Sequence, residues 1–587
     1  MNTRIPEEHF FAAGDGARLF YRAWQPANGS AQNPRAIVLL HRGHEHSGRL
    51  QHVVDELNLP DFAMFAWDAR GHGHSRDSLG SDTSLATFVR DLDAFVSHVC
   101  REHGVRIEDV AIVAQSVGSV LAATWVHDYA PRIRCMVLAS PAFKVKLYVP
   151  FARAGLNLLH HVIGDFNVNS YVKARALTHD PERIRSFESD PLIQRPISAR
   201  VLLGLYSTSG RVVTDARGIR TPVQLLISGS DWVVHHGPQH EFFERLGSTI
   251  KEKHVFEGFY HDTLGEKDRG PVIDKVRRFL LARFAESPRH ESLLHADRNG
   301  HTKEEYDQLC RPLPALSPRR VVFATTRFGL KTGGRLSDGI RLGLKTGFDS
   351  GSTLDYVYRC NASGLTPAGT LIDWLYLHSI GWRGIRVRRE NLRELIVRSA
   401  LQLQSEGKPV RILDIAAGHG RYVLETAAQL QPRPERVTLR DYSDINVQEG
   451  RALIRQNGLD ELAAFGKGDA FDRAQLAAIR PRPTLGIVSG LYELFPDNDT
   501  VGASLAGLAD AIEPGGYLIY TGQPWHPQLE FIARVLPSHR DHKPWIMRRR
   551  TQAELDELVE HAGFTKTSQL IDDWGIFTVS VAQRRAA

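Results

Sequence analysis

The sequence predicts an α/β protein of two domains, each built around a largely parallel sheet. Its 587 residues exceed what one hydrophobic core usually serves, so two or three domains are expected. Short β-branched runs alternate with longer helical periods from Arg18 to about Phe284, and again from Pro409 onward. Each stretch also carries one functional motif at a predicted strand end, a serine in the first and a glycine turn in the second.

The first stretch is predicted to form a domain of residues 1–285. Its expected strands are Arg18–Trp24, Ala36–His41, Ala63–Asp68, Val110–Ala114, Ile133–Ala139, Val223–Ser228 and His254–Glu257. Apolar residues at helical spacing predict helices over Leu85–Arg101 and Val117–His127. Residues 142–206 interrupt this alternation with helical patterns, so we expect an inserted helical cap there.

The second stretch follows two segments of different composition. Residues 286–320 are rich in Pro, His, Arg and Ser and are predicted to be a linker. Residues 321–400 form a basic extension that repeats Gly-Leu-Lys-Thr-Gly, which indicates local duplication or shared turn chemistry. This extension either covers a substrate pocket or has a packing role. The second domain, residues 401–587, has expected strands at Arg411–Ile415, Val437–Arg440, Thr484–Val488, Tyr517–Tyr520 and Gly575–Val581, with helices from Gly420 and over Gln552–Ala562.

Composition narrows the class of protein. The net charge of +6 is too diffuse to indicate nucleic-acid binding, although it would favour anionic lipid or acidic substrates. The four cysteines lack metal-ligand spacing and suit a reducing cytosol. The first residues have no apolar segment typical of a secretory signal, and no stretch approaches the ~18 apolar residues that cross a bilayer. We therefore expect a cytoplasmic protein, soluble or at most peripheral to a membrane, without a metal.

Ser116 is the predicted nucleophile of the first domain. It stands in Ala-Gln-Ser-Val-Gly-Ser, directly after an apolar strand and before a helix. Such a sharp turn exposes a hydroxyl and needs small neighbours, which Ala114 and Gly118 provide. A serine also needs a base, and Asp231 and His261 each follow a later predicted strand. The order Ser, Asp, His at three strand ends predicts a catalytic triad.

Three further motifs make this half resemble the serine-hydrolase family of monoacylglycerol lipases and lysophospholipases, an α/β-hydrolase family. They are His41–Arg49, Asp68–Ser75 and Asp190–Leu192, within a resemblance that runs from about Phe10 to Phe284. The resemblance implies that the backbone N–H groups of Gly43 and Val117 hold the oxyanion of the tetrahedral intermediate. Arg42 stands where this family usually has glycine.

Many histidines lie near these motifs and suggest a metal site as an alternative. The oxyanion loop already accounts for His41, His44 and His46, and no His–carboxylate set has a metal-ligand spacing. Asp68 and His72 are interpreted as structural residues that hold a turn.

The glycine turn of the second domain has two interpretations. Asp414-Ile-Ala-Ala-Gly-His-Gly420 follows a buried strand and opens a helix, as a nucleotide-cofactor site does. A dinucleotide motif Gly-x-Gly-x-x-Gly counted from Gly418 would need glycine where Val423 stands. Asp414 is also better suited to a cationic amino-acid group than to a pyrophosphate.

The motif resembles the first motif of class I methyltransferases that use S-adenosyl-L-methionine, with Ala416 in place of its first glycine. The resemblance covers about Arg411 to Arg584 and includes Glu513–Tyr517 and the last helix and turn. It implies that Asp441 binds the ribose hydroxyls and that Asp469 and Ala470 border the adenine. The implied cofactor-binding residues are Asp414, Ala416, Gly418, Gly420, Asp441, Asp469 and Ala470.

The whole order of segments resembles the bacterial bifunctional family in which an α/β-hydrolase precedes a class I, Rossmann-like methyltransferase. The leading hypothesis is an esterase of the lysophospholipase or monoacylglycerol lipase type fused to a methyltransferase of unknown acceptor. Apolar and basic residues of the cap would admit an acyl chain and touch an anionic membrane. The alternatives are a peptide or small non-lipid ester as substrate, and a second domain that only binds its cofactor.

Ser489–Glu493 stands where methyltransferases acting on nucleic-acid amino groups have an Asn-Pro-Pro-Tyr motif. This difference argues against such an acceptor.

Overall fold

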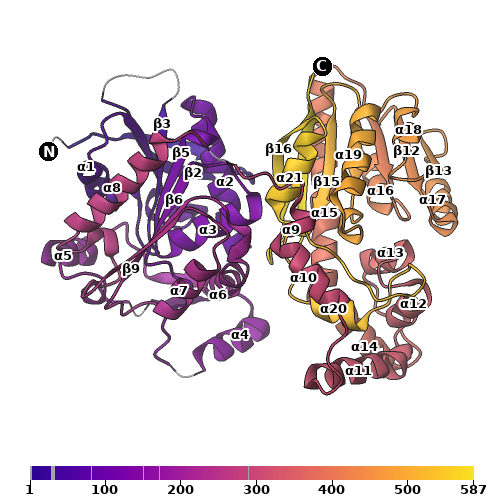
Figure 1. Ribbon diagram of the computed structural model, residues 1–587, viewed down its shortest axis with the longest axis horizontal. Coiled ribbons are helices and arrows are strands. Elements are labelled where there is room, and N and C mark those ends of the chain that lie inside the picture. The colour runs from indigo at the N-terminus through magenta and orange to yellow at the C-terminus, as the bar shows by residue number, and fades with distance from the viewer. Residues whose placement is uncertain are drawn as a thin grey trace. The chain divides into compact units, whose positions relative to one another are not determined.

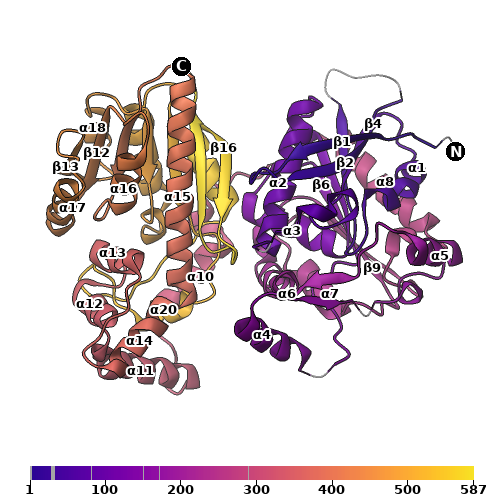
Figure 2. The same ribbon diagram turned by 180° about the vertical axis from the view of Figure 1, so that it is seen from behind.

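The computed structural model describes residues 3–27, 34–80, 82–149, 151–170, 172–288 and 290–586 (Figures 1 and 2). The chain divides into two compact units, Met1–His290 and Glu291–Ala587. Among the helices of the described ranges, none has the length and hydropathy needed to cross a bilayer.

An eight-stranded sheet forms the centre of the first unit. In spatial order its strands are β1 (Glu7–Ala12), β2 (Arg18–Trp24), β4 (Phe62–Trp67), β3 (Arg35–Leu40), β5 (Val110–Gln115), β6 (Cys135–Ala139), β9 (Val223–Ser228) and β10 (Lys251–Phe256). The six strands from β4 to β10 are parallel, while β1 and β2 are antiparallel to their neighbours. Helices cover both faces of a parallel sheet, which is why most of these strands read as continuous apolar runs.

Helices α1 (Gln51–Leu57) and α8 (Gly270–Ala285) pack on one face of this sheet. Helices α2 (Leu85–Glu102) and α3 (Val117–Tyr129) lie on the other, where α6 (Ala199–Thr214) contacts both (Figures 1 and 2). Helix α7 (His236–Arg245) packs against α6. The predicted fold class is confirmed in this half.

The segment predicted to form a cap lies between β6 and β9. It contains α4 (Ala152–Ile163), α5 (Pro181–Ser189) and the antiparallel pair β7 (Asn167–Asn169) and β8 (Pro196–Ser198). The short pair was not predicted, because three-residue strands leave no periodic signal. Helix α6 also begins within the predicted cap and continues to Thr214, whereas the cap was expected to end at residue 206.

The second unit has a seven-stranded sheet. Its order is β13 (Ala463–Lys467), β12 (Arg436–Asp441), β11 (Arg411–Ile415), β14 (Leu485–Val488), β15 (Tyr517–Gly522), β17 (Thr578–Arg584) and β16 (Phe564–Ile571). The first five strands are parallel, and β17 runs antiparallel to both neighbours. The strand order reverses between β11 and β14, the switch point where such sheets bind ligands. The α/β class is confirmed here too.

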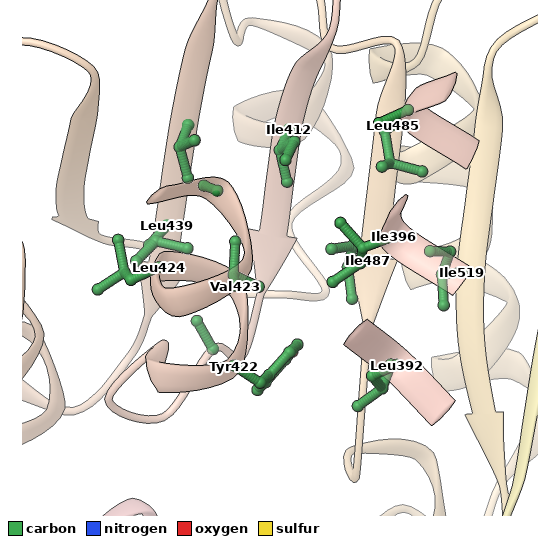
Figure 3. Close-up of a cluster of buried hydrophobic side chains, with 14 of the residues drawn as sticks. Leu392, Ile396, Ile412, Tyr422, Val423, Leu424, Leu439, Leu485, Ile487 and Ile519 are labelled. Atoms are coloured by element: carbon green, nitrogen blue, oxygen red, sulfur yellow. The ribbon is translucent and has the colours of Figure 1, made fainter. Parts of the chain in front are cut away.

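Two helical layers sandwich this second sheet. Helices α15 (Ile380–Ser405) and α16 (Arg421–Gln429) bury apolar side chains against one face, and Figure 3 shows Leu392 and Val423 in that core. Helices α19 (Asn498–Ala511) and α21 (Gln552–His561) pack on the opposite face. The remaining helices are α17 (Asp444–Gln456), α18 (Arg473–Ala477) and α20 (Leu529–Val535).

The structure differs from the predicted linker over 286–320. The boundary between the units falls at His290, and the residues after it form α9 (Ala296–Asn299) and α10 (His301–Cys310). These short helices are held largely by polar contacts: Asp297 accepts from the Asn498 amide, and Thr302 accepts from Arg548. Because those contacts leave little apolar periodicity, the sequence pattern resembled a linker.

The basic extension is helical, with α11 (Pro318–Lys331), α12 (Asp338–Thr346), α13 (Gly351–Arg359) and α14 (Pro367–Leu377) preceding α15. Both copies of Gly-Leu-Lys-Thr-Gly lie at helix ends, one closing α11 and the other closing α12. Gly347 ends the second copy at φ +92°, a conformation that glycine adopts readily. The first copy instead ends its helix at Thr332 with φ −106°, so the two copies share a place at a helix end but not a turn conformation.

Candidate active sites

Ser116 occupies a strained turn between β5 and α3. Its φ of 56° and ψ of −115° are rare for a residue with a side chain and indicate a conformation imposed by the surroundings. Gly118 makes the turn possible, since a Cβ there would lie 2.7 Å from the carbonyl oxygen of His41 and 2.9 Å from that of Leu40. The small-residue pattern around Ser116 therefore has a steric cause.

The structure brings the three predicted triad residues together. His261 Nε2 lies 2.7 Å from Ser116 Oγ, and His261 Nδ1 lies 2.7 Å from Asp231 Oδ2. The other oxygen of Asp231 accepts hydrogen bonds from the amides of Val233 and Val234 at 2.7 and 3.0 Å. Burial opposes ionisation of Asp231, but His261 and these amides outweigh it and lower the pKa of the carboxyl group. An ionised Asp231 is thus placed to orient the imidazole.

Gly43 and Val117 both line the cavity that contains Ser116 and His261. Within the described part of the chain, neither backbone N–H has a hydrogen-bond acceptor. Two such amides beside a nucleophile form an arrangement able to bind a developing oxyanion.

Arg42 is accommodated by a buried ion network that the sequence did not reveal. Its guanidinium donates to Glu45 at 2.8 Å, and Glu45 also accepts from Arg49. The network continues to Asp262, which accepts from Arg183 and from Gln115, the residue before Ser116. Arg42 is 4% exposed, so its charge serves this interior network and not the solvent. Only the unusual arginine itself signalled this network in the sequence.

Several histidines of the first unit have structural partners. Nδ1 of His41 lies 2.7 Å from the Arg42 carbonyl oxygen, while its Nε2 accepts from the Ala69 amide. His46 pairs with Asp190 at 2.9 Å. Asp68 accepts from the amides of Ser47 and His74 and so holds two turns. Over the described ranges, no group of three His, Cys, Asp or Glu residues is arranged to hold a metal.

A large apolar cavity opens beside Ser116. Its volume is about 780 Å³, within the range typical of ligand sites. The cap contributes much of the apolar wall, including Leu147, Val149, Leu156, Leu159, Val168 and Ile197. Ser116 therefore faces a space suited to an apolar chain.

The glycine turn of the second unit lies after β11, at the switch point. Ala416, Gly418 and Gly420 all have positive φ, at 55°, 58° and 72°. A Cβ at Gly420 would lie 2.6 Å from a methyl of Leu439, whereas one at Gly418 would meet only Gly351 at 3.6 Å. Ala416, where glycine is expected, thus carries backbone strain.

Asp414 is fully buried beneath this turn. Its Oδ2 accepts from Tyr422 at 2.7 Å, and its Oδ1 has no partner among the described residues. Burial, with a smaller contribution from Asp441, raises the pKa of Asp414 well above its usual range, although Tyr422 partly offsets this. A buried oxygen without a donor is the kind of group that a ligand amino group would satisfy.

Asp441 ends β12 and binds the turn from the side. One oxygen accepts from the Gly418 amide at 2.9 Å, and the other accepts from Ser443 and Asn446. A carboxylate has about four acceptor positions, so one remains for a ligand hydroxyl. Asp469 is exposed and accepts from the Phe471 amide, and Ala470 packs against the core on the α19 side. The glycine turn and the ends of β12 and β13 thus lie at one edge of the sheet.

A second cavity, of about 400 Å³, lies in this unit. Gly490 and Gln523, which follow β14 and β15, lie on its wall together with residues of the helical extension. The extension thus forms part of the wall of this cavity, which agrees with a role in covering a substrate pocket.

Comparison with known proteins agrees with this division of the chain. Residues 276–584 match the family model described as "Putative methyltransferase", and residues 31–268 match the model described as "Serine aminopeptidase, S33". The fold and these matches define a two-domain protein, an α/β-hydrolase followed by a domain of a methyltransferase family.

One relative matches the whole chain, and two others match only its first half. YnbC of Escherichia coli (strain K12) is 54% identical over 584 residues, covering 100% of this chain and 99% of that protein. Monoacylglycerol lipase of Mycolicibacterium smegmatis is 26% identical over 48% of this chain and 99% of its own length. Human monoglyceride lipase is 26% identical over 42% of this chain and 80% of its own length. The chain belongs to the methyltransferase family above and, along its whole length, to the family of YnbC, with a monoglyceride lipase-like first domain.

Proposed function

We propose that the first domain is a serine ester hydrolase acting on monoacylglycerols or lysophospholipids, and that the second is an S-adenosyl-L-methionine-dependent methyltransferase. The observation that carries the first part is the hydrogen-bonded chain from Asp231 through His261 to Ser116, at the wall of an apolar cavity. The second part is supported by the family match and by the glycine turn at the switch point.

The geometry supports an acyl-enzyme mechanism. Ser116 Oγ attacks the ester carbonyl while His261 Nε2 takes its proton, and Asp231 holds the imidazole in the required tautomer. The amides of Gly43 and Val117 bind the oxyanion. His261 then protonates the leaving alcohol, and water activated by the same imidazole releases the acid.

A lipid substrate agrees with the outer surface of the cap as well as with the cavity. Helix α4 has no buried residue, and Phe151, Leu158 and Val162 are 89, 68 and 73% exposed. Basic residues, Lys144 and Arg153 among them, lie in or next to this apolar surface in the sequence. Such a combination favours contact with an anionic membrane.

A peptide substrate is the second candidate, because one family model is described as a serine aminopeptidase. An aminopeptidase needs a carboxylate to receive the amino terminus of the peptide. Among the described residues that line the cavity there is neither Asp nor Glu. The cavity thus favours an uncharged acyl chain over a peptide amine.

The hydrolase proposal is tested by fluorophosphonate labelling of the wild type and of Ser116→Ala. We expect labelling of the wild type only, and faster hydrolysis of monoacylglycerol than of an aminoacyl anilide. Equal labelling of both proteins would refute the assignment of the nucleophile, and preferred anilide cleavage would select the peptide alternative.

The residues of the second domain suit S-adenosyl-L-methionine. Asp414 offers a buried acceptor for its amino group, the turn at Ala416, Gly418 and Gly420 allows close backbone approach, and Asp441 retains an acceptor position for a ribose hydroxyl. We propose that Asp469 and Ala470 border the adenine. The cofactor would supply an electrophilic methyl group on sulfur.

Calorimetric titration separates this proposal from its alternatives. We expect saturable binding of S-adenosyl-L-methionine and none of NAD. Binding of NAD alone would refute the methyltransferase function. Cofactor binding without turnover on any acceptor would favour a binding module.

A further inference from the structure

The second cavity contains polar groups that the proposed function has not used. Gly490 and Gln523 place it beyond the carboxyl ends of β14 and β15, at the same sheet edge as the glycine turn. Its walls are mostly aromatic and aliphatic, with Phe348, Trp382, Ile385, Phe531, Trp545 and Phe577 among them. The part of a ligand that contacts these walls would be apolar.

Arg388 brings a buried positive charge to this apolar space. It lies on α15, is 2% exposed, and its Nε–H has no hydrogen-bond partner among the described residues. The carboxylate of Glu493 is 3.8 Å from its Nη1, beyond hydrogen-bonding distance. Leaving a buried guanidinium without acceptors is costly, so a ligand that accepts from it would be strongly favoured.

Glu493 compensates this charge only in part. Burial raises the pKa of Glu493 and shifts the group toward its uncharged form, although Arg388 opposes the shift. Asp349, the other carboxylate on the wall, is already engaged by Ser538 and by the His539 amide. Neither carboxylate on the wall thus accepts a hydrogen bond from Arg388, and its N–H groups remain available to an acceptor on a ligand.

Two further donors lie on the same wall. Gln523 is 4% exposed, and its Nε2 has no partner within the described residues. His526 Nδ1 accepts from the Gln528 amide, so the proton of the neutral ring is on Nε2. Burial lowers the pKa of His526 to about 4, which keeps the ring neutral at physiological pH. Three N–H donors, one of them on a charged guanidinium, thus border a single apolar space.

We propose that this cavity binds a small carboxylic acid with an apolar body, held through its carboxylate by Arg388, Gln523 and His526, and that this acid is the methyl acceptor. Only the last clause rests on the proposed methyltransferase function. The carboxylate oxygen would form a bond to the donated methyl carbon as that carbon's bond to sulfur breaks, so an anion and a sulfonium cation become a neutral ester and a neutral thioether. No base is needed for this step.

A hydrolysis reaction would supply such a substrate. Cleavage of an acyl ester by the first domain releases a carboxylate with an apolar chain, which is the same chemical class. The two proposed reactions would then act in succession on the acyl group.

The test is calorimetric titration of the full-length protein with octanoate, 3-phenylpropionate, 1-octanol and octylamine. We expect at least one of the two carboxylates to bind, with the alcohol and the amine weaker by about tenfold or more. Octanoate and 3-phenylpropionate separate an aliphatic acid from an aromatic one. Arg388→Gln should weaken carboxylate binding by about ten- to hundredfold.

Arg398→Gln is the matched control, because Arg398 lies exposed on the same helix and pairs with Glu394 at 2.6 Å. Octanoate binding in the first cavity would be unchanged by substitution of either arginine. Only the binding that is lost in Arg388→Gln is therefore assigned to the second cavity. If Arg388→Gln fails to fold by circular dichroism, Gln523→Leu provides the second variant, with an expected loss of about tenfold.

Equal affinity of the Arg388→Gln and Arg398→Gln proteins, or equal binding of octanoate and 1-octanol, would overturn the inference. A parallel titration with S-adenosyl-L-methionine keeps the two failures apart. Cofactor binding without Arg388-dependent carboxylate binding refutes the carboxylate site and leaves the methyltransferase function standing. Carboxylate binding without cofactor binding refutes the methyltransferase function, and with it the acceptor role, and leaves the carboxylate site standing.

Discussion

The candidate site of the first unit is formed mainly by side chains, whereas that of the second unit is formed mainly by backbone conformation. In the first unit, reactive side chains touch directly, with 2.7 Å contacts from Ser116 to His261 and from His261 to Asp231. In the second unit, the site consists of backbone conformation and buried acids, with three positive φ values in five residues and a carboxylate beneath them. Chemistry performed by side chains requires particular residue types, whereas a cradle for a cofactor requires mainly shape. The two sites should therefore respond differently to substitution.

Asp231→Asn should cause the largest loss. The amide would favour the wrong imidazole tautomer, and we expect kcat for ester hydrolysis to fall by about 10⁴-fold, the size of effect that the same substitution has in a serine-protease triad. Binding of S-adenosyl-L-methionine should not change, because the second unit has its own core.

Initial rates with a monoacylglycerol and calorimetry with the cofactor measure the two effects in one preparation. Asp77→Asn, at an exposed position of the same unit, should retain full activity. A fall of less than tenfold in Asp231→Asn would show that the triad geometry is not used.

Acid should weaken the first unit more than the second. Burial lowers the pKa of His44, His52 and His72 in the first unit to about 4, while His526 is the corresponding group in the second. An unfolded histidine titrates near 6.5, so between about pH 6.5 and 4 the unfolded chain binds more protons. The free energy of unfolding therefore falls as pH is lowered through this window, by on the order of 3 kcal/mol for each such histidine.

Pulse proteolysis in urea at pH 7 and pH 5, with fragments assigned by mass spectrometry, follows each unit separately. His72→Gln should reduce the pH dependence of the first unit alone. Equal losses in both units would contradict the assignment of these neutral histidines.

The first site was more readable from the sequence than the second. Ser116, Asp231 and His261 each follow an apolar strand, and parallel strands bring their carboxyl ends to one edge, so residue type and position together predicted the contact. The ion network of Arg42, Glu45 and Asp262 could not be predicted, because its members come from distant segments with no common spacing. The same reason hid the cavity around Arg388, whose wall comes from the extension and from loops after two strands.

Fold prediction failed where polar contacts replaced apolar periodicity. Most central strands were expected within a few residues, since their apolar runs are continuous. The sequence pattern indicated a linker where α9 and α10 lie, and it did not indicate β13 or β16, because half-exposed segments carry a weak pattern. The antiparallel position of β17 depends on contacts that no local pattern records.

Gly118→Ala and Gly418→Ala sharpen the comparison between the two turns. At Gly118 the new Cβ would press against two backbone carbonyls, and we expect a loss of about 1–3 kcal/mol of stability in the first unit together with lost hydrolysis. At Gly418 the Cβ has ordinary contact, so only the φ of +58° opposes it, by about 1 kcal/mol.

Urea unfolding of each unit measures both values. Gly210→Ala, at an exposed helical position with nothing within 4 Å of the new Cβ, is the control and should not destabilise the first unit. A Gly418→Ala loss larger than that of Gly118→Ala would reverse the steric interpretation.

Ala416→Gly should have the smallest effect, and it should increase cofactor affinity where the other substitutions cause a loss. Ala416 has a φ of 55°, a conformation that is strained for alanine but not for glycine, so the substitution relieves strain in the folded state. Glycine also increases the entropy of the unfolded chain, which opposes this gain. The two contributions nearly cancel in stability, to within about 1 kcal/mol. Cofactor affinity should still rise by a few fold, since a ligand could then approach the backbone of the turn without meeting a methyl group at position 416. Calorimetry with S-adenosyl-L-methionine decides this, with Ala417→Gly as a neighbouring control that has no positive φ to relieve. If Ala416→Gly instead weakens binding, then the alanine methyl contacts the ligand, and the departure from glycine is a feature of specificity in this turn.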